Sequence, residues 1–289
     1  DEILECDIPS DAIVTSWRGD AGAVDGAQRG NKVILSPNSH LYFDFYQTKD
    51  TQLEPFAIGG YLPVEKVYSF EPIPSELKGD TAKLVIGAQA NLWTEYIKTF
   101  DHVQYMELPR MAALAEVVWS QPEKKDYASF LNRIPALLQI YDALGYNYAK
   151  HLADVSAEYT PNVDDKSLDV KLSTLKGRTI HYTLDGTEPT VNSPVCENSV
   201  KVNSDAILKA ASFDAAGTMS RIICDTISVN KASFCKATLN TQPHKNYTYR
   251  GVQTLFDGIK GNGNYRTGRW LGFTENDCDV TIDLGEVMH

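Results

Sequence analysis

The chain has 289 residues, of which 43% are hydrophobic, so it is long enough for two or three domains that each bury a core. It carries 38 acidic and 27 basic residues, a net charge of −11, and no basic stripe, which argues against nucleic acid as a partner. Since no apolar run approaches the roughly 18 residues of a membrane-spanning helix, we expect no membrane span.

The five cysteines give no sign of a metal site. None of them forms a CxxC pair, and no histidine stands at zinc-ligand spacing, so we expect neither a structural metal nor a cofactor. Free buried thiols are favoured over a disulfide, although a Cys196–Cys224 pair stays open as an alternative.

Residues 1–150 alternate the signals of strands and helices. Short apolar runs rich in β-branched residues predict strands, and apolar residues at helical spacing predict helices. We expect strands at 12–17, 32–37 and 84–90, and helices at 22–30, 102–119 and 126–145. Asp101 is the expected N-cap of the second helix, while Pro135 and Gly145 are expected to bend and to end the third. This order predicts a parallel sheet buried on both faces, as in a β/α barrel, with a long irregular segment at 42–80.

The pattern changes after residue 152. Strands with period-two alternation, separated by turn signals such as "LDGT" and "DAAG", predict a small antiparallel sandwich. A third region starts near residue 231, is rich in turn residues and contains the strand-like "DVTIDL". It is too short for a complete β domain of usual size. The chain begins at "DEILECD" and ends within this strand-like region, and we expect both ends to be internal to a longer protein.

Aromatic residues stand at the ends of the three strands expected in the first region. Trp17, Tyr42 and Trp93 occupy these positions, and Asp44 and Glu95 follow the last two at a spacing of two residues. In an extended segment this spacing puts both side chains on the same face. Sugar C–H faces pack on aromatic rings, and sugar hydroxyls form charge-assisted hydrogen bonds with carboxylates. The pattern therefore predicts a sugar site where these strand ends converge.

A glycosidase ordinarily needs two carboxyl groups that flank the scissile bond. From the residues alone, Glu95 as acid and Asp44 as nucleophile form one such pair. That interpretation requires the two carboxyl groups to lie within the roughly 5–9.5 Å that such pairs span.

Five separated motifs resemble the family 20 glycoside hydrolases, the β-N-acetylhexosaminidases, in that family's order. They are "SWRG", "VILSPNSHLYFD", "IGGYLPVEKVYSF", "GAQANLWTEYI" and "PRMAALAEVVWS". The resemblance implies a (β/α)₈ TIM barrel that this chain enters at strand five. It also implies substrate-assisted retaining hydrolysis, in which the substrate's acetamide oxygen is the nucleophile and a consecutive Asp-Glu pair on strand four assists it. The corresponding "GGDE"-type motif is absent from this sequence.

The resemblance assigns a role to each candidate residue. Trp17 and Trp93 are similar to the walls of the pocket that encloses the N-acetyl methyl group. Tyr42 resembles the hydroxyl donor that stabilises the acetamide and oxazolinium charge, and is the catalytic residue expected here. Asp44 and Glu95 resemble residues that bind hydroxyls of the non-reducing sugar. The acid/base pair is expected to be missing, so the chain alone is expected to be inactive.

Three domains follow from these resemblances. Residues 1–151 are expected to form the C-terminal half of a TIM-barrel glycosidase domain. Residues 152–230 resemble the chitobiase/hexosaminidase C-terminal β-sandwich, and 231–289 resemble the start of a discoidin-like (factor 5/8 type C) β jelly roll. The expected partners are glycans with a terminal N-acetylhexosamine and the missing N-terminal half of the barrel, in the periplasm, on the surface or outside of a bacterium. The alternative is a non-catalytic glycan-binding protein that uses the C-terminal β modules.

Overall fold

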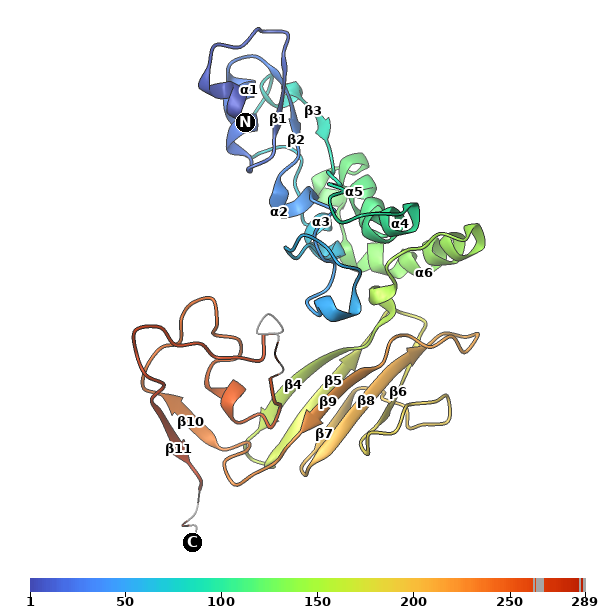
Figure 1. Ribbon diagram of the computed structural model, residues 1–289, viewed down its shortest axis with the longest axis vertical. Helices are drawn as coiled ribbons and strands as arrows, with labels where there is room; N and C mark the ends of the chain where they lie inside the picture. Colours follow the sequence, from blue (N-terminus) through green and yellow to red (C-terminus); the bar gives the residue numbers. More distant parts are fainter. Residues whose placement is uncertain (262, 264–267, 286, 288–289) are drawn as a thin grey trace. The chain divides into compact units, whose positions relative to one another are not determined.

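The computed structural model describes residues 1–261, 263, 268–285 and 287. The chain forms two compact units, Asp1–Ala149 and Lys150–His289 (Figure 1). No helix within the described residues has both the length and the apolar character needed to cross a bilayer. The first unit is α/β and the second is built from β-strands.

A parallel three-stranded sheet organises the first unit. Its strands are β1 (Ile13–Ser16), β2 (Lys32–Leu35) and β3 (Val85–Ala88), in the order β1-β2-β3 (Figure 1). Both strand pairs are parallel, as the alternation of strand and helix signals predicts. Val14, Val33 and Leu35 are buried, because their runs of apolar, β-branched residues suit a sheet with covered faces.

Six α-helices and four 3₁₀ turns accompany this sheet. The helices are α1 (Ala21–Gln28), α2 (Asn38–Leu41), α3 (Val64–Tyr68), α4 (Phe100–Glu107), α5 (Arg110–Trp119) and α6 (Tyr127–Leu144). The 3₁₀ turns are η1 (Glu2–Glu5), η2 (Thr51–Leu53), η3 (Ala82–Leu84) and η4 (Pro122–Lys124). The segment 42–80 is largely irregular, as predicted, except for η2 and α3.

The single helix predicted over 102–119 is wrong. The chain forms two helices, α4 and α5, which are separated at Leu108–Pro109 because a proline has no N–H to continue the ladder of α4. The predicted N-cap Asp101 is also wrong. Helix α4 begins at Phe100, two residues earlier than predicted, and the Oγ1 of its N-cap Thr99 accepts a hydrogen bond from the N–H of His102 at 3.2 Å.

Helix α6 agrees with its prediction at both ends. The carboxylate of Asp126 accepts from the N–H of Ser129 at 3.1 Å, which satisfies one of the free N–H groups of the first turn. The helix ends at Gly145, whose φ of 69° is the left-handed conformation that glycine adopts without strain. Pro135 lies inside the helix.

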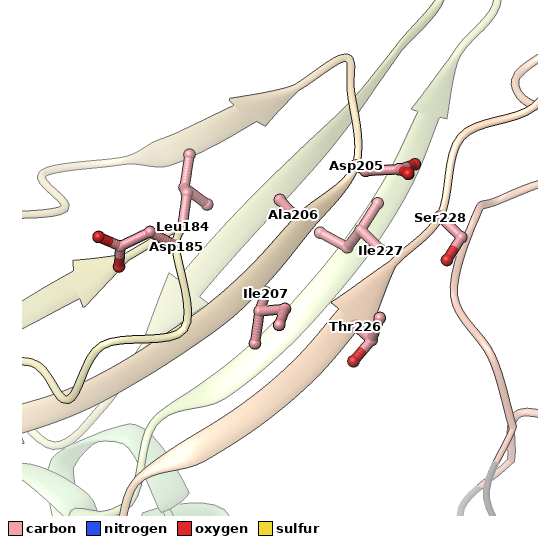
Figure 2. A pocket seen from close by; sticks show the side chains of 8 residues that line it. All are labelled: Leu184, Asp185, Asp205, Ala206, Ile207, Thr226, Ile227 and Ser228. Carbon is pink, nitrogen blue, oxygen red and sulfur yellow. The ribbon is translucent and has the colours of Figure 1, made fainter.

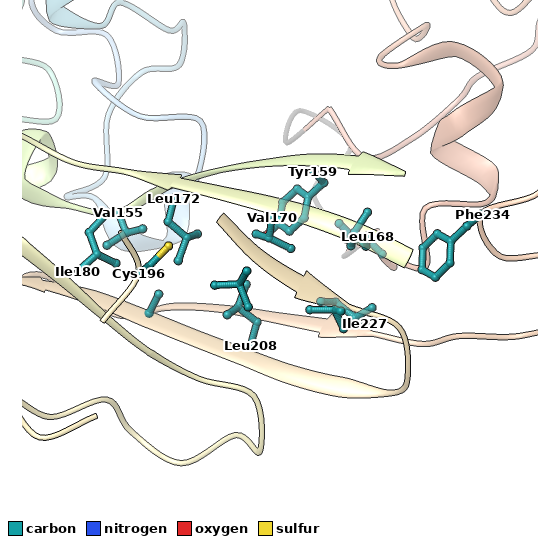
Figure 3. Close-up of a cluster of buried hydrophobic side chains, with 14 residues drawn as sticks. Val155, Tyr159, Leu168, Val170, Leu172, Ile180, Cys196, Leu208, Ile227 and Phe234 are labelled. Carbon is teal, nitrogen blue, oxygen red and sulfur yellow. The ribbon is translucent and has the colours of Figure 1, made fainter. Parts of the chain in front are cut away.

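The second unit contains two three-stranded antiparallel sheets. One has the order β4-β5-β7 and the other β6-β8-β9. Their bounds are β4 (Ser156–Asn162), β5 (Ser167–Ser173), β6 (Thr179–Thr183), β7 (Ser199–Val202), β8 (Ala206–Phe213) and β9 (Ile223–Ile227). Leu168, Val170 and Leu172 alternate along β5 and meet Leu208 of β8 in one core, as Figure 3 shows. The antiparallel pairing predicted for this region is confirmed.

The rest of the second unit, as far as the structure describes it, lies outside these two sheets. It comprises η5 (Lys150–Ala153), β10 (Lys236–Leu239), η6 (Gly251–Leu255) and β11 (Val280–Asp283), with β10 and β11 antiparallel. Phe234 and Ile259 enter the same core as the sandwich strands. The predicted boundary at 230/231 therefore separates residues that share one core, and whether 231–289 is a separate domain stays a prediction.

All five cysteines are free thiols. Cys196 and Cys235 are buried, as predicted, whereas Cys6, Cys224 and Cys278 are exposed. The Cys196–Cys224 disulfide that the sequence leaves open does not form, since both side chains are free.

Candidate functional site

The candidate site lies beyond the carboxyl ends of β2 and β3. The parallel pairing continues past the strands, because the N–H of Gln89 donates to the carbonyl of Leu35 at 2.9 Å. Further on, Tyr42 and Asn91 form a parallel bridge, and the N–H of Phe43 donates to the carbonyl of Asn91 at 2.7 Å. The segments that carry the predicted site residues are thus paired with each other, at the edge of a parallel sheet where active sites form.

Asp44 is the most unusual carboxyl group of this edge. It is only 5% exposed, and a backbone hydrogen bond from Trp93 reaches it. Burial raises the pKa of Asp44, and the nearby charge of Glu95 raises it further, while backbone hydrogen bonds and Arg110 act in the opposite direction. Within the described residues its Oδ1 has no hydrogen-bond partner. A buried carboxylate oxygen of this kind can accept a ligand hydroxyl.

Three other predicted residues lie around Asp44. Glu95 is exposed, and its charge acts on Asp44. Trp93 is 52% exposed, so a large part of its indole is available to a ligand. Tyr42 is half-buried, with its ring centroid 5.8 Å from that of Phe45. The structure therefore brings an acid pair and two aromatic residues together at paired backbone segments.

Trp17 stands at the end of β1, the neighbouring strand. Its carbonyl accepts from the N–H of Asn38 at 2.8 Å, which places it beside the segment that follows β2. Its half-buried indole donates to Glu2 at 3.3 Å, and the guanidinium of Arg18 lies 4.9 Å from the ring centroid. Trp17 thus stands at the same edge of the sheet, and its side chain contacts Glu2 and Arg18.

Sequence reasoning missed Arg110, which is fully buried beneath Asp44's segment. Its guanidinium donates to the carbonyls of Phe45 at 3.0 Å and Leu62 at 3.1 Å, and also to that of Phe43. The sequence does contain a pattern that points to Arg110. Arg110 stands at helical spacing with Ala113, Leu114 and Val117, the buried face of α5, where a charged residue needs polar partners.

Glu54 and Gly60 help to fix the backbone conformation of the irregular segment 42–80. The carboxylate of Glu54 accepts from the N–H groups of Gln47, at 3.0 Å, and Thr48. Gly60 has a φ of 67°, and a Cβ at that position would lie 2.4 Å from the ring of Phe45. The carbonyl of Phe45 accepts a hydrogen bond from Arg110, which holds the backbone that carries this ring.

Gly60→Ala should therefore destabilise the first unit by more than backbone strain alone. We expect a loss of about 1–3 kcal/mol from the collision with Phe45, in addition to the cost of the left-handed conformation. Gly79→Ala is the matched control, since Gly79 has a similar φ of 58° and no atom within 4 Å of an added Cβ. Urea denaturation of both variants measures the difference, and equal losses would contradict the collision.

A pocket of about 300 Å³ lies in the second unit, and none of the predicted site residues lines it (Figure 2). Its carboxylates already serve local turns: Asp205 accepts from the N–H of Val229 at 2.7 Å, and Asp185 from the N–H of Thr187 at 3.0 Å. It is lined by Leu184, Asp185, Asp205, Ala206, Ile207, Thr226, Ile227 and Ser228. We assign no function to this pocket.

Residues 1–122 match the glycosyl hydrolase family 20 catalytic domain, and residues 162–224 match the chitobiase/beta-hexosaminidase C-terminal domain. A Beta-hexosaminidase of Porphyromonas gingivalis is 38% identical over 226 residues, which are 77% of this chain and 29% of that protein. A Beta-N-acetylhexosaminidase of Cellulomonas fimi is 30% identical over 51% of this chain and 30% of its own length. The GH20 exo beta-N-acetylglucosaminidase of Vibrio harveyi, solved with N-acetylglucosamine, is 30% identical over 52% of this chain and 24% of that chain, with a TM-score of 0.46.

The two family matches define the domains that this chain contains. It contains part of a glycosyl hydrolase family 20 catalytic domain, followed by a chitobiase/beta-hexosaminidase C-terminal domain. The chain spans less than a third of the length of these two curated relatives.

Proposed function

We propose that the chain is part of an exo-β-N-acetylhexosaminidase and supplies the sugar-binding half of its active site. The enzyme would release terminal N-acetylglucosamine or N-acetylgalactosamine with retention, using the substrate's own acetamide as nucleophile. The observation that carries this proposal is the pairing of the segments after β2 and β3, which brings Tyr42, Asp44, Trp93 and Glu95 to one edge of the sheet.

The chemistry of each side chain suits its proposed role. The hydroxyl of Tyr42 would donate to the acetamide oxygen and stabilise the charge that develops as the oxazolinium ring closes. The exposed indole of Trp93, together with Trp17, would pack against the N-acetyl methyl group and the sugar face. Asp44 and Glu95 would accept hydrogen bonds from sugar hydroxyls, which are strongest when the acceptor is ionised.

We propose further that the first unit is the second half of a (β/α)₈ barrel. Its three parallel strands alternate with helices, and the outer strands β1 and β3 leave Ile13 and Ile86 about half exposed. The catalytic Asp-Glu pair would come from a segment outside these 289 residues. Residues 231–289 would be the first part of a discoidin-like module, for which the antiparallel pair β10-β11 is the available support.

Sugar titrations of the 289-residue chain test this proposal. We expect N-acetylglucosamine or N-acetylgalactosamine to bind more tightly than glucose, because only they carry the acetamide that Tyr42 and Trp93 would hold. Trp93→Ala should abolish most of this preference. Trp119→Ala is the matched control, since Trp119 is 90% exposed on α5 and has no proposed contact with the sugar.

An activity assay tests directly the half-site proposal, in which the chain supplies only the sugar-binding half of the active site. Incubation with an aryl N-acetyl-β-glucosaminide should give no turnover by the pure chain, because the acid/base pair is missing. Robust hydrolysis would refute the half-site proposal and would favour Asp44 and Glu95 as a two-carboxylate pair.

A second candidate is glycan binding by the second unit. Tyr247, Tyr249 and Trp270 each keep about two fifths of their surface exposed, and exposed aromatic rings are what a sugar face packs on. Trp270→Ala in the full chain separates the candidates. If that variant loses sugar binding and Trp93→Ala keeps it, the second unit carries the function.

A further inference from the structure

We propose that Arg110 is a positioning residue for Asp44, because its guanidinium holds the backbone on both sides of that carboxyl group. This inference rests on the proposed role of Asp44 in binding a sugar hydroxyl. Arg110 opens α5, directly after Pro109, and no part of it is exposed. It touches no proposed ligand position, so it acts through Asp44.

The hydrogen bonds of Arg110 reach the residues on either side of Asp44 in the sequence. One terminal nitrogen donates to the carbonyl of Phe45 at 3.0 Å, and the other donates to the carbonyl of Phe43. These are the residues immediately after and before Asp44, and they lie in a turn that has no regular strand ladder. A rigid planar fork can bond both carbonyls at once, whereas the compact ammonium of a lysine cannot reproduce that geometry.

Further bonds anchor the fork itself. Nε donates to the carbonyl of Met106 at 3.0 Å, so the guanidinium is tied to the end of α4. One terminal nitrogen also donates to the carbonyl of Leu62 at 3.1 Å, which links the far arm of the irregular segment to the same group. The guanidinium lies 4.9 Å from the centroid of the Phe43 ring, in a cation–π contact. Arg110 is thus fixed from α4, from the segment and from its aromatic neighbour.

The charge of Arg110 also acts on Asp44. Burial lowers the pKa of Arg110 to about 9, so it stays protonated at neutral pH, and the charges of Glu54, Asp44 and Tyr105 favour the protonated form. At Asp44, burial and Glu95 raise the pKa, while backbone hydrogen bonds and Arg110 lower it. Arg110 therefore helps to keep Asp44 ionised, the form that binds a hydroxyl most strongly.

Two substitutions separate geometry from charge. Arg110→Lys keeps the charge and loses the fork, so we expect weaker N-acetylglucosamine binding with little change in the pH at which binding is half lost. Arg110→Met loses both, so binding should weaken by about ten-fold or more, and its pH midpoint should move upward because Asp44 protonates more easily. Arg133→Met is the matched control, since Arg133 is an exposed arginine that pairs with Glu116.

The decisive readout is the pKa of the Asp44 carboxyl, followed by carbon NMR of the free chain. An upward shift in Arg110→Met but not in Arg133→Met supports the inference, even if the wild-type chain binds no sugar, in which case the proposed function fails alone. An unchanged pKa together with unchanged affinity overturns the inference. If Arg110→Met shows no cooperative thermal transition, Phe43→Leu replaces it. That variant removes the ring beneath the guanidinium, and an affinity equal to that of the wild type would overturn the inference.

Discussion

Phe234→Ala should lower the free energy of unfolding of the second unit by about 3–5 kcal/mol, the usual cost of deleting a buried phenylalanine ring. Phe234 is 1% exposed and packs in the core that includes Leu168 and Ile227 of the sandwich (Figure 3). Its φ of 61° is rare for a residue with a side chain, so its packing holds it in a conformation that its backbone alone disfavours. The alanine variant keeps that strain and loses the packing.

Polar contacts also join the sandwich to the residues that follow position 231. The hydroxyl of Tyr159 on β4 donates to Asp225 on β9, and Arg269 forms an ion pair with the same buried carboxylate. Arg250 pairs with the buried Asp257 and donates to the carbonyl of Tyr159. Removing one member of a buried pair leaves the other charge without a partner, which is costly. The sandwich and the residues after 231 are therefore expected to unfold together.

Urea denaturation, followed by circular dichroism and by tryptophan fluorescence, tests this expectation. Leu255→Ala is the matched control, because Leu255 lies in η6 of the same region but is 41% exposed, and its loss should be small. If Phe234→Ala instead weakens a minor transition and leaves the main transition of the sandwich unchanged, residues 231–289 form a separate module, as the sequence resemblance implies.

The sequence predicts the strands of the first unit because their signals are strong and local. Val33, Ile34 and Leu35 form a continuous apolar run, which a sheet covered on both faces requires. Two strands of the sandwich that the sequence does not reveal, β4 and β7, have weaker patterns. β4 contains Pro161, which is unusual inside a strand, and β7 has only four residues. Both are specified by the partners that they pair with rather than by their own residues.

The candidate site is predictable as far as strand ends can be ordered along the chain. The spacing of Asp44 behind Tyr42 and of Glu95 behind Trp93 is visible in the sequence, and parallel strands explain why the two pairs meet. The support beneath them is not visible. Arg110 reaches Phe43 and Phe45 across more than sixty residues, and its hydrogen bonds depend on the break at Pro109 that the helical pattern conceals.

Asp44→Asn should separate function from stability. At neutral pH we expect this variant to bind N-acetylglucosamine at least about ten-fold more weakly, because an ionised acceptor is lost. The ligand-free variant should nevertheless be more stable than the wild-type chain, by about 0.5–2 kcal/mol, since relieving a functional residue of its burial penalty commonly gains this much. The reason is that burial disfavours the ionised form of Asp44, whose Oδ1 has no partner among the described residues.

The pH dependence of this stability difference follows from the direction of the pKa shift. Burial raises the pKa of Asp44 in the folded chain, so the fold disfavours the ionised form and loses stability at pH values above that pKa. As the pH falls through the folded pKa, Asp44 takes up a proton, the penalty disappears, and the advantage of asparagine should shrink. Asp25→Asn is the matched control: Asp25 pairs with Arg29 on the surface, so its loss should change stability by no more than about 1 kcal/mol and leave binding intact. Thermal denaturation of the three proteins from pH 4 to pH 8 measures the effect. If Asp44→Asn were less stable than the wild type at every pH, Asp44 would be a structural carboxylate, and its proposed place in the sugar site would have to be abandoned.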